Sequence, residues 1–66
     1  MGRIRRGGYI LIWWKGDHPP RHVHVFDSDG KIITRVKLET LEPMDIAKID
    51  RKIVDLITEL QKEGRL

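Results

Sequence analysis

The sequence contains no cysteine, which excludes disulfide bonds and thiolate metal ligands. It also has no long hydrophobic run. The apolar run at residues 9–14 is far too short to span a membrane, and it lacks the small-residue cleavage site of a signal peptide. Both absences lead us to expect a cytoplasmic protein without a membrane partner. With 66 residues the chain is also too short for two domains, so we expect one domain over residues 1–66.

Acidic residues are fewer than basic ones, 10 against 13, and the formal net charge is +3. This mild positive charge suits an anionic partner such as nucleic acid without requiring one. Residues 1–8, with the sequence M-G-R-I-R-R-G-G, contain three of the arginines. We expect this segment to be a flexible basic arm, with a short strand as the alternative. In either form its arginines can contact phosphates.

Three segments have the composition of strands. Residues 9–14, Y-I-L-I-W-W, are β-branched or aromatic throughout and apolar on both faces, so both faces should be covered. Residues 22–26 and 31–39 follow. A turn over residues 27–30 joins them, and its Asp29-Gly30 pair is typical of a hairpin. The pattern therefore predicts an antiparallel meander of three strands.

The hairpin loop also sets which residues share a face. A loop of two or four residues places Val23 and Val25 with Ile32, Thr34 and Val36, whereas a loop of three would place the histidines there. Burying the apolar residues together selects the first arrangement, because a slip of one residue turns a whole face around. We therefore expect the valine face to be the core and the histidine face to be open.

A C-terminal helix is predicted from Met44 to Glu63, because apolar residues recur there at helical spacing. Pro43 suits a first turn, Thr40 or Glu42 can help to cap it, and Gly64 suits the C-terminal end. The predicted fold is α+β: a three-stranded antiparallel sheet with one amphipathic helix packed on one face (β-β-β-α). Its exposed edges and two-sided apolar first strand lead us to expect a homodimer.

The ten residues Asp17 to Phe26, D-H-P-P-R-H-V-H-V-F, contain every histidine of the chain. His22 and His24 are two apart on a strand and should point to the same side. His18 lies on the preceding loop, and it can join them as a third metal ligand with Asp17 as a fourth ligand or orienting group. Zinc or another divalent transition metal would suit this set, although we expect no cofactor in the leading interpretation.

The leading interpretation is that the histidine face binds nucleic acid, most plausibly RNA. One set of first-strand aromatics, ending in either Trp13 or Trp14, can stack bases there. A histidine can act as general acid or base on a ribose 2′-hydroxyl without a metal, and the candidate catalytic residues are His18, His22 and His24. The alternatives are a metal-binding or protein-interaction module and a merely solvated face. The candidate phosphate contacts are the basic residues Arg3, Arg5, Arg6, Lys15, Arg21, Arg35 and Lys37.

The motif D-H-P-P-R-H-V-H-V resembles the small prokaryotic proteins grouped as the DUF4160 family. Their pattern is an aromatic-rich strand, then D-H-x-P-P-H-x-H-V, a hairpin and a helix. Here the prolines come one place early and Arg21 fills the gap. The family has no established activity. The resemblance implies a member of a small two-gene module of the toxin–antitoxin kind, with an antitoxin-like protein as partner.

A second resemblance is to the HicA mRNA interferase toxins, whose fold is similar to double-stranded-RNA-binding domains. The segment G-Y-I-L-I-W-W-K-G-D-H at residues 8–18 and the ending E-G-R-L carry this resemblance. Asp17 stands where that family has the serine of its G-S-H motif, and an N-terminal helix is missing. The resemblance implies that His18 is the catalytic residue of an endoribonuclease.

Overall fold

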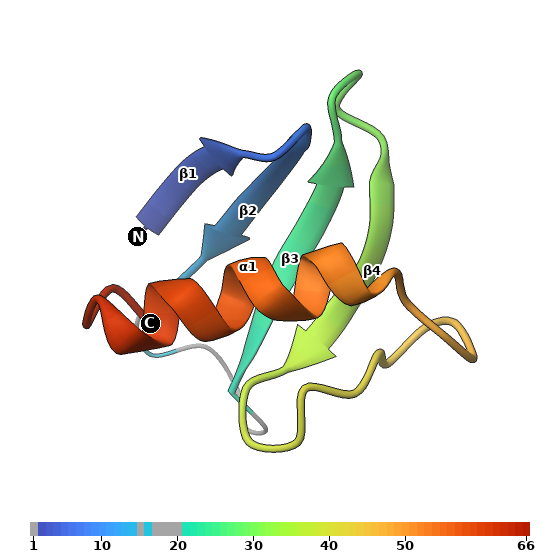
Figure 1. Cartoon of the computed structure of the whole chain (residues 1–66). Helices are drawn as coiled ribbons and strands as arrows, with labels where there is room; N and C mark the ends of the chain where they lie inside the picture. Colours follow the sequence, from blue (N-terminus) through green and yellow to red (C-terminus); the bar gives the residue numbers. More distant parts are fainter. Residues whose placement is uncertain (1, 15, 17–20) are drawn as a thin grey trace.

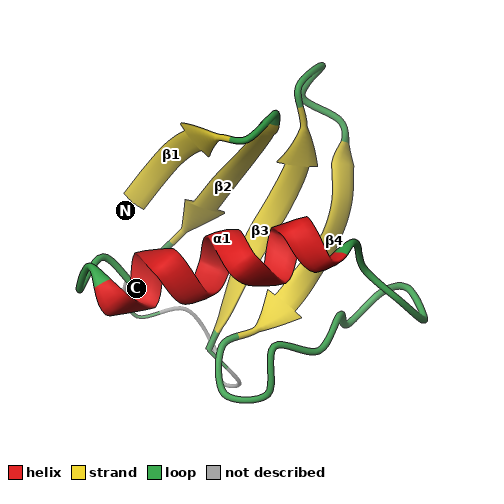
Figure 2. Ribbon diagram, in the orientation of Figure 1, coloured by secondary structure: helices red, strands yellow, loops and turns green. Residues whose placement is uncertain are grey.

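The computed structural model describes residues 2–14, 16 and 21–66. These residues form one antiparallel sheet with a single helix across one of its faces (Figures 1 and 2). The α+β class and the C-terminal helix are confirmed, but the sheet has four strands and not three. In chain order the elements are β1 (Gly2–Arg6), β2 (Tyr9–Trp13), β3 (His22–Asp27), β4 (Ile32–Lys37) and α1 (Arg51–Lys62), and the strands lie side by side in the same order.

The additional strand is β1, which forms from the segment expected to be a flexible arm. Gly7 and Gly8 have φ angles of 63° and 84°. A two-residue turn with both φ angles positive twists in the same sense as a hairpin, and glycine adopts it without strain. β1 therefore folds back onto β2, with Arg6 opposite Tyr9 and Gly2 opposite Trp13. The arm prediction is wrong for residues 2–6, and the alternative of a short strand is correct.

The hairpin between β3 and β4 buries the valines that the sequence analysis assigned to the core face. Val23 lies opposite Val36 and Val25 opposite Thr34, and all four are buried. They pack under α1, whose buried residues are Ile53, Leu56, Ile57 and Leu60. With Leu11 of β2, these apolar side chains form the core. The valine face is thus the core face, as the sequence predicted.

One residue of the predicted core face lies elsewhere. The register shifts after Val25, so that Phe26 lies opposite Ile32 and an extra residue, Ile33, enters β4. Ile32 is 57% exposed, while Ile33 packs against the core. The cause lies in the turn, where the carboxylate of Asp27 accepts hydrogen bonds from the backbone N–H groups of Asp29 and Lys31. The backbone N–H of Asp27 also donates to the carbonyl of Lys31, so the loop has three residues, 28–30, and not the two or four expected. The bulge compensates for this loop and keeps the valines on the core face.

The helix begins later than predicted, at Arg51 and not at Met44. Asp50 is its N-cap, and its side chain accepts a hydrogen bond from the backbone N–H of Lys52 at 3.1 Å. Thr40 and Glu42 do not cap it. The chain cannot be helical at residues 41–45 because its polar groups there bond to the outer edge of β4. No helix among the described residues is long and apolar enough to cross a membrane.

Candidate nucleic-acid interface

The sheet face opposite α1 is built by the residues that alternate with the core residues. We call it the open face, because no described helix or strand covers it (Figure 2). Strand pairing brings these residues into rows across the sheet, with Arg3, Ile12, His24 and Arg35 in one row. The full set is Arg3 and Arg5 from β1, Ile10 and Ile12 from β2, His22, His24 and Phe26 from β3, Ile32, Arg35 and Lys37 from β4, and Trp14 just after β2.

The open face has an apolar and aromatic centre between two basic rims. Its two central strands supply isoleucines, imidazoles and phenylalanine, while each edge strand supplies two cations. Ile10 is only 8% exposed although no helix covers it, so neighbouring side chains of the same face shield it. Three strand spacings of about 4.8 Å separate the rims by roughly 14 Å. The described strand residues of this face include no acidic side chain, but Asp45, which follows β4, pairs with Arg35 at 2.8 Å. The β1 rim therefore presents two arginine charges, and the β4 rim presents the charge of Lys37 beside an Arg35–Asp45 ion pair.

The two strand histidines lie together on this face. The ring centroids of His22 and His24 are 5.0 Å apart, with a tilt of 57°. Trp14 meets the ring of His24 edge-on, at 4.7 Å and 89°. The Nδ1 atom of His24 is shielded from solvent. Trp14 is 43% exposed while Trp13 packs against the core, which decides what the sequence left open: Trp14 is the tryptophan of the open face.

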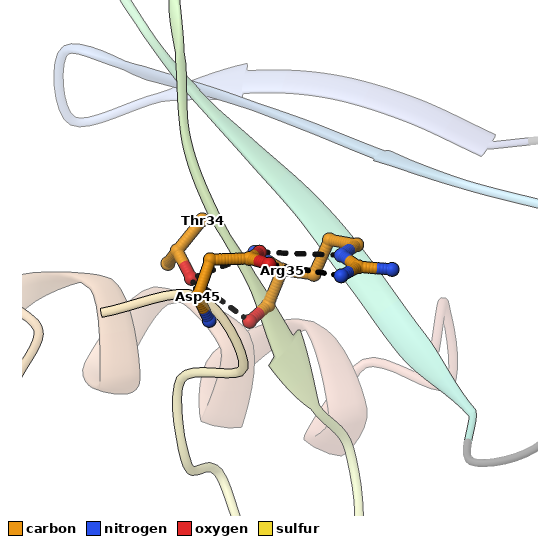
Figure 3. A network of polar contacts seen from close by, with 3 residues as sticks. All are labelled: Thr34, Arg35 and Asp45. Carbon is orange, nitrogen blue, oxygen red and sulfur yellow. Dashed lines mark hydrogen bonds and ion pairs between the residues drawn. The ribbon is translucent and has the colours of Figure 1, made fainter. Parts of the chain in front are cut away.

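Arg35 is fixed in place at the β4 rim by Asp45 (Figure 3). Its Nη2 and Nε atoms donate to the Asp45 carboxylate at 2.8 and 3.2 Å, and its backbone N–H donates to the same carboxylate at 3.0 Å. The Thr34 hydroxyl completes the network by accepting from the backbone N–H of Asp45. These hydrogen bonds from Arg35 lower the pKa of Asp45 to about 2. The sequence interpretation missed Asp45 because it placed this residue on the polar face of a helix.

Arg6 lies apart from the other candidate cations. It shares its side of β1 with the core residues, and its guanidinium donates to Glu63 at 2.9 Å at the C-terminal end of α1. Glu59 lies 3.7 Å from the same group. The hydrogen bond from Arg6 lowers the pKa of Glu63. Arg6 therefore connects β1 to α1 through ion pairs on the core side of the sheet. It does not belong to the open face.

The remaining candidates have three different outcomes. Arg21 is exposed just before β3, where its backbone carbonyl accepts from the N–H of Leu38 at 3.0 Å. Lys15, Asp17 and His18 lie outside the described residues. Within residues 2–14, 16 and 21–66, no group of three or more His, Cys, Asp or Glu side chains is placed to hold a metal ion. A zinc site that includes Asp17 and His18 stays a prediction.

The chain is a small α+β domain whose sheet is covered by a helix on one side. Residues 7–65 match the model of the family described as domain of unknown function (DUF4160), and the chain belongs to this family. The match contains β2, β3, β4 and α1 but not β1. No curated protein and no solved structure matches the chain significantly. The resemblance to HicA toxins is not found by these comparisons.

Proposed function

We propose that the open face binds single-stranded RNA. The observation that supports this most directly is the pairing of two rims that carry basic side chains with an aromatic centre on one sheet face. Phosphates of a nucleic acid are held by arginine and lysine, and unstacked bases are held by aromatic faces. On this face no described helix is available to enter a duplex groove, which favours a single strand over a duplex.

The strand positions suggest which groups do which task. Arg3 and Arg5 on one rim and Lys37 on the other contact phosphates. Phe26 and Trp14 offer rings for stacking, near the central strand β3. Arg35 contributes a guanidinium whose orientation Asp45 fixes, so less side-chain freedom is lost when RNA binds.

The histidine pair supports a second function on the same face, which is RNA cleavage. One imidazole can take the proton of a ribose 2′-hydroxyl while the 2′-oxygen attacks the neighbouring phosphorus. The bond from phosphorus to the 5′-oxygen then breaks, and an imidazolium donates a proton to that oxygen. The distance of 5.0 Å between the rings of His22 and His24 favours this proposal, because it places both groups beside one phosphate. The catalytic role of His18 and membership of a toxin–antitoxin pair remain predictions.

Binding can be tested with a fluorescently labelled polyuridine strand by anisotropy at several salt concentrations. The variants Arg3→Gln and Lys37→Gln should weaken binding, and each should reduce the slope of log affinity against log salt by about 0.7, the value for one phosphate contact on a single strand. Arg51→Gln is the matched control, because Arg51 is an exposed cation on α1. Equal affinities for the open-face variants and this control would contradict the proposal.

Stacking and cleavage need separate measurements. Trp14→Leu should lose about 1–3 kcal/mol of binding free energy if a base stacks on this ring. Cleavage of the same strand, followed on a gel with EDTA present, should be lost in His22→Ala and His24→Ala while binding persists. Intact RNA after incubation with the wild-type protein would remove the cleavage proposal and leave the binding proposal in place.

A further inference from the structure

The two edge strands of the sheet differ in how their outward-facing backbone groups are used. In an antiparallel pair, every second residue exchanges hydrogen bonds with its partner and the residues between point their N–H and C=O groups away. Arg6 and Tyr9 close a two-residue turn, so they form a hydrogen-bonded pair. By alternation, Arg3 and Arg5 direct their backbone groups to the outer side of β1. Among the described residues, no backbone hydrogen bond reaches that side.

On the opposite edge the same alternation holds beyond the bulge, and there the outward groups are occupied. These outward groups belong to Arg35 and Lys37. The N–H of Lys37 donates to the carbonyl of Glu42 at 3.0 Å, and its carbonyl accepts from Leu41 at 2.8 Å. The carbonyl of Arg35 accepts from the N–H of Met44 at 2.8 Å, and its N–H donates to Asp45. Among the described residues, β1 is therefore the edge with outward groups open to another strand, whereas β4 is closed from Arg35 to Lys37.

We propose that β1 is a docking edge for an extended acidic segment of a partner protein, which adds a fifth strand to the sheet. Two arginines, Arg3 and Arg5, stand on the open face of this edge and are exposed. Ile4, between them, points to the helix side and packs partly against the core. A strand beside β1 would meet cations on one face and an apolar side chain on the other. The complementary segment alternates acidic and apolar residues.

The positive charge of β1 also argues against a second copy of this chain as the added strand. If two β1 strands paired antiparallel, the arginines of both copies would stand opposite one another on the same face. Like charges directly opposite across strands are destabilising. β1 contains no acidic residue that could offset this repulsion. Its third arginine, Arg6, lies on the other face and is paired with Glu63. The family match, over residues 7–65, does not cover β1.

The proposal can be tested with a labelled synthetic peptide in which glutamate and valine alternate, and a control peptide with lysine in place of glutamate. The glutamate peptide should bind the wild-type protein and the lysine peptide should not. Arg5→Gln should weaken binding, because one charge is lost. Arg5→Pro removes the same charge and also the outward N–H, so it should weaken binding by up to about tenfold more, the effect of losing one hydrogen bond. Equal effects of the two variants would overturn strand addition.

Two further measurements keep the test decisive if Arg5→Pro does not fold. In wild-type protein, the amide protons of Arg3 and Arg5 should become protected from exchange when the glutamate peptide is added, while those of β4 should not change. Protection elsewhere would overturn the proposal. Sedimentation tests the homodimer that the sequence led us to expect. A dimer that Arg3→Pro dissociates would assign this edge to a second copy and overturn the proposal, whereas a monomer, or a dimer that Arg3→Pro leaves intact, keeps β1 free for the acidic segment. RNA affinity should be equal in Arg5→Gln and Arg5→Pro, so a failure here is distinguishable from a failure of RNA binding.

Discussion

The edges of the sheet show two ways in which a small protein controls an exposed strand. β4 is closed by its own chain, since residues 41–45 satisfy the outward groups of Arg35 and Lys37. β1 has no such cover among the described residues and carries exposed arginines. Charge on an edge strand discourages pairing with identical edges but permits a partner of opposite charge. Closing β4 engages Met44 and Asp45, the first two residues of the segment that the apolar spacing predicted to be helical.

The largest expected difference between the edges is in how firmly their side chains are packed. Val36→Ala in β4 should lower the free energy of unfolding by about 2–3 kcal/mol, because the side chain is fully buried and leaves a cavity. Ile4→Ala in β1 deletes more atoms but should cost only about 1 kcal/mol, because Ile4 is half-buried. Urea unfolding followed by circular dichroism measures both values. A greater loss for Ile4→Ala would mean that β1 is the more firmly packed edge.

A pair of proline substitutions tests the use of backbone groups directly. Lys37→Pro should cost about 1–3 kcal/mol, because it removes a bonded N–H and leaves the carbonyl of Glu42 without its donor. Arg3→Pro should cost less than about 1 kcal/mol, because the N–H that it removes points outward and the β1–β2 hydrogen bonds stay intact. Thermal unfolding of the two variants beside wild type measures this difference. Similar losses would show that the assignment of outward groups is wrong.

The smallest expected effect is the loss of stability at low pH when the Asp45 carboxylate of the β4 edge is protonated. The pKa of Asp45 is lowered to about 2 by its hydrogen bonds from Arg35. Because the folded-state pKa is below that of the unfolded chain, the ion pair stabilises the fold above about pH 4, and this contribution is lost as the pH falls towards 2. Asp45→Asn should therefore be less stable than wild type at neutral pH and lose less of its stability over that acid range. Melting temperatures against pH measure this, with Asp55→Asn as an exposed control.

Local patterns predicted the parts of the fold whose residues pack among themselves. Alternation in residues 22–26 and 31–39 placed the valines in the core and the histidines on the opposite face, and the apolar stripe of α1 located the helix. β1 was missed because an arginine- and glycine-rich segment has the composition of a flexible arm. Its pairing depends on the turn at Gly7-Gly8 and on room for the Trp13 ring, which a Cβ at position 2 would overlap.

The other errors have tertiary causes as well. The late start of α1 has two parts: Met44 and Asp45 bond to β4, and Asp50 caps the helix at its observed start, and helical periodicity reveals neither. Ile33 and not Ile32 packs against the core, because the hydrogen bonds of the Asp27 side chain at the turn set up a bulge. For the candidate site, alternation predicted the shared face of His22 and His24. It did not reveal Asp45 or the separate position of Arg6, because both depend on contacts between distant segments.

The cover that residues 41–45 place on β4 has a consequence for self-association. Amyloid-like fibrils grow because every added chain offers a new unpaired strand to the next. In this sheet the far edge is already bonded from Arg35 to Lys37, which opposes continued growth through the same molecule. A strand added at β1 therefore leaves no new free edge from Arg35 to Lys37 to which a further chain could add.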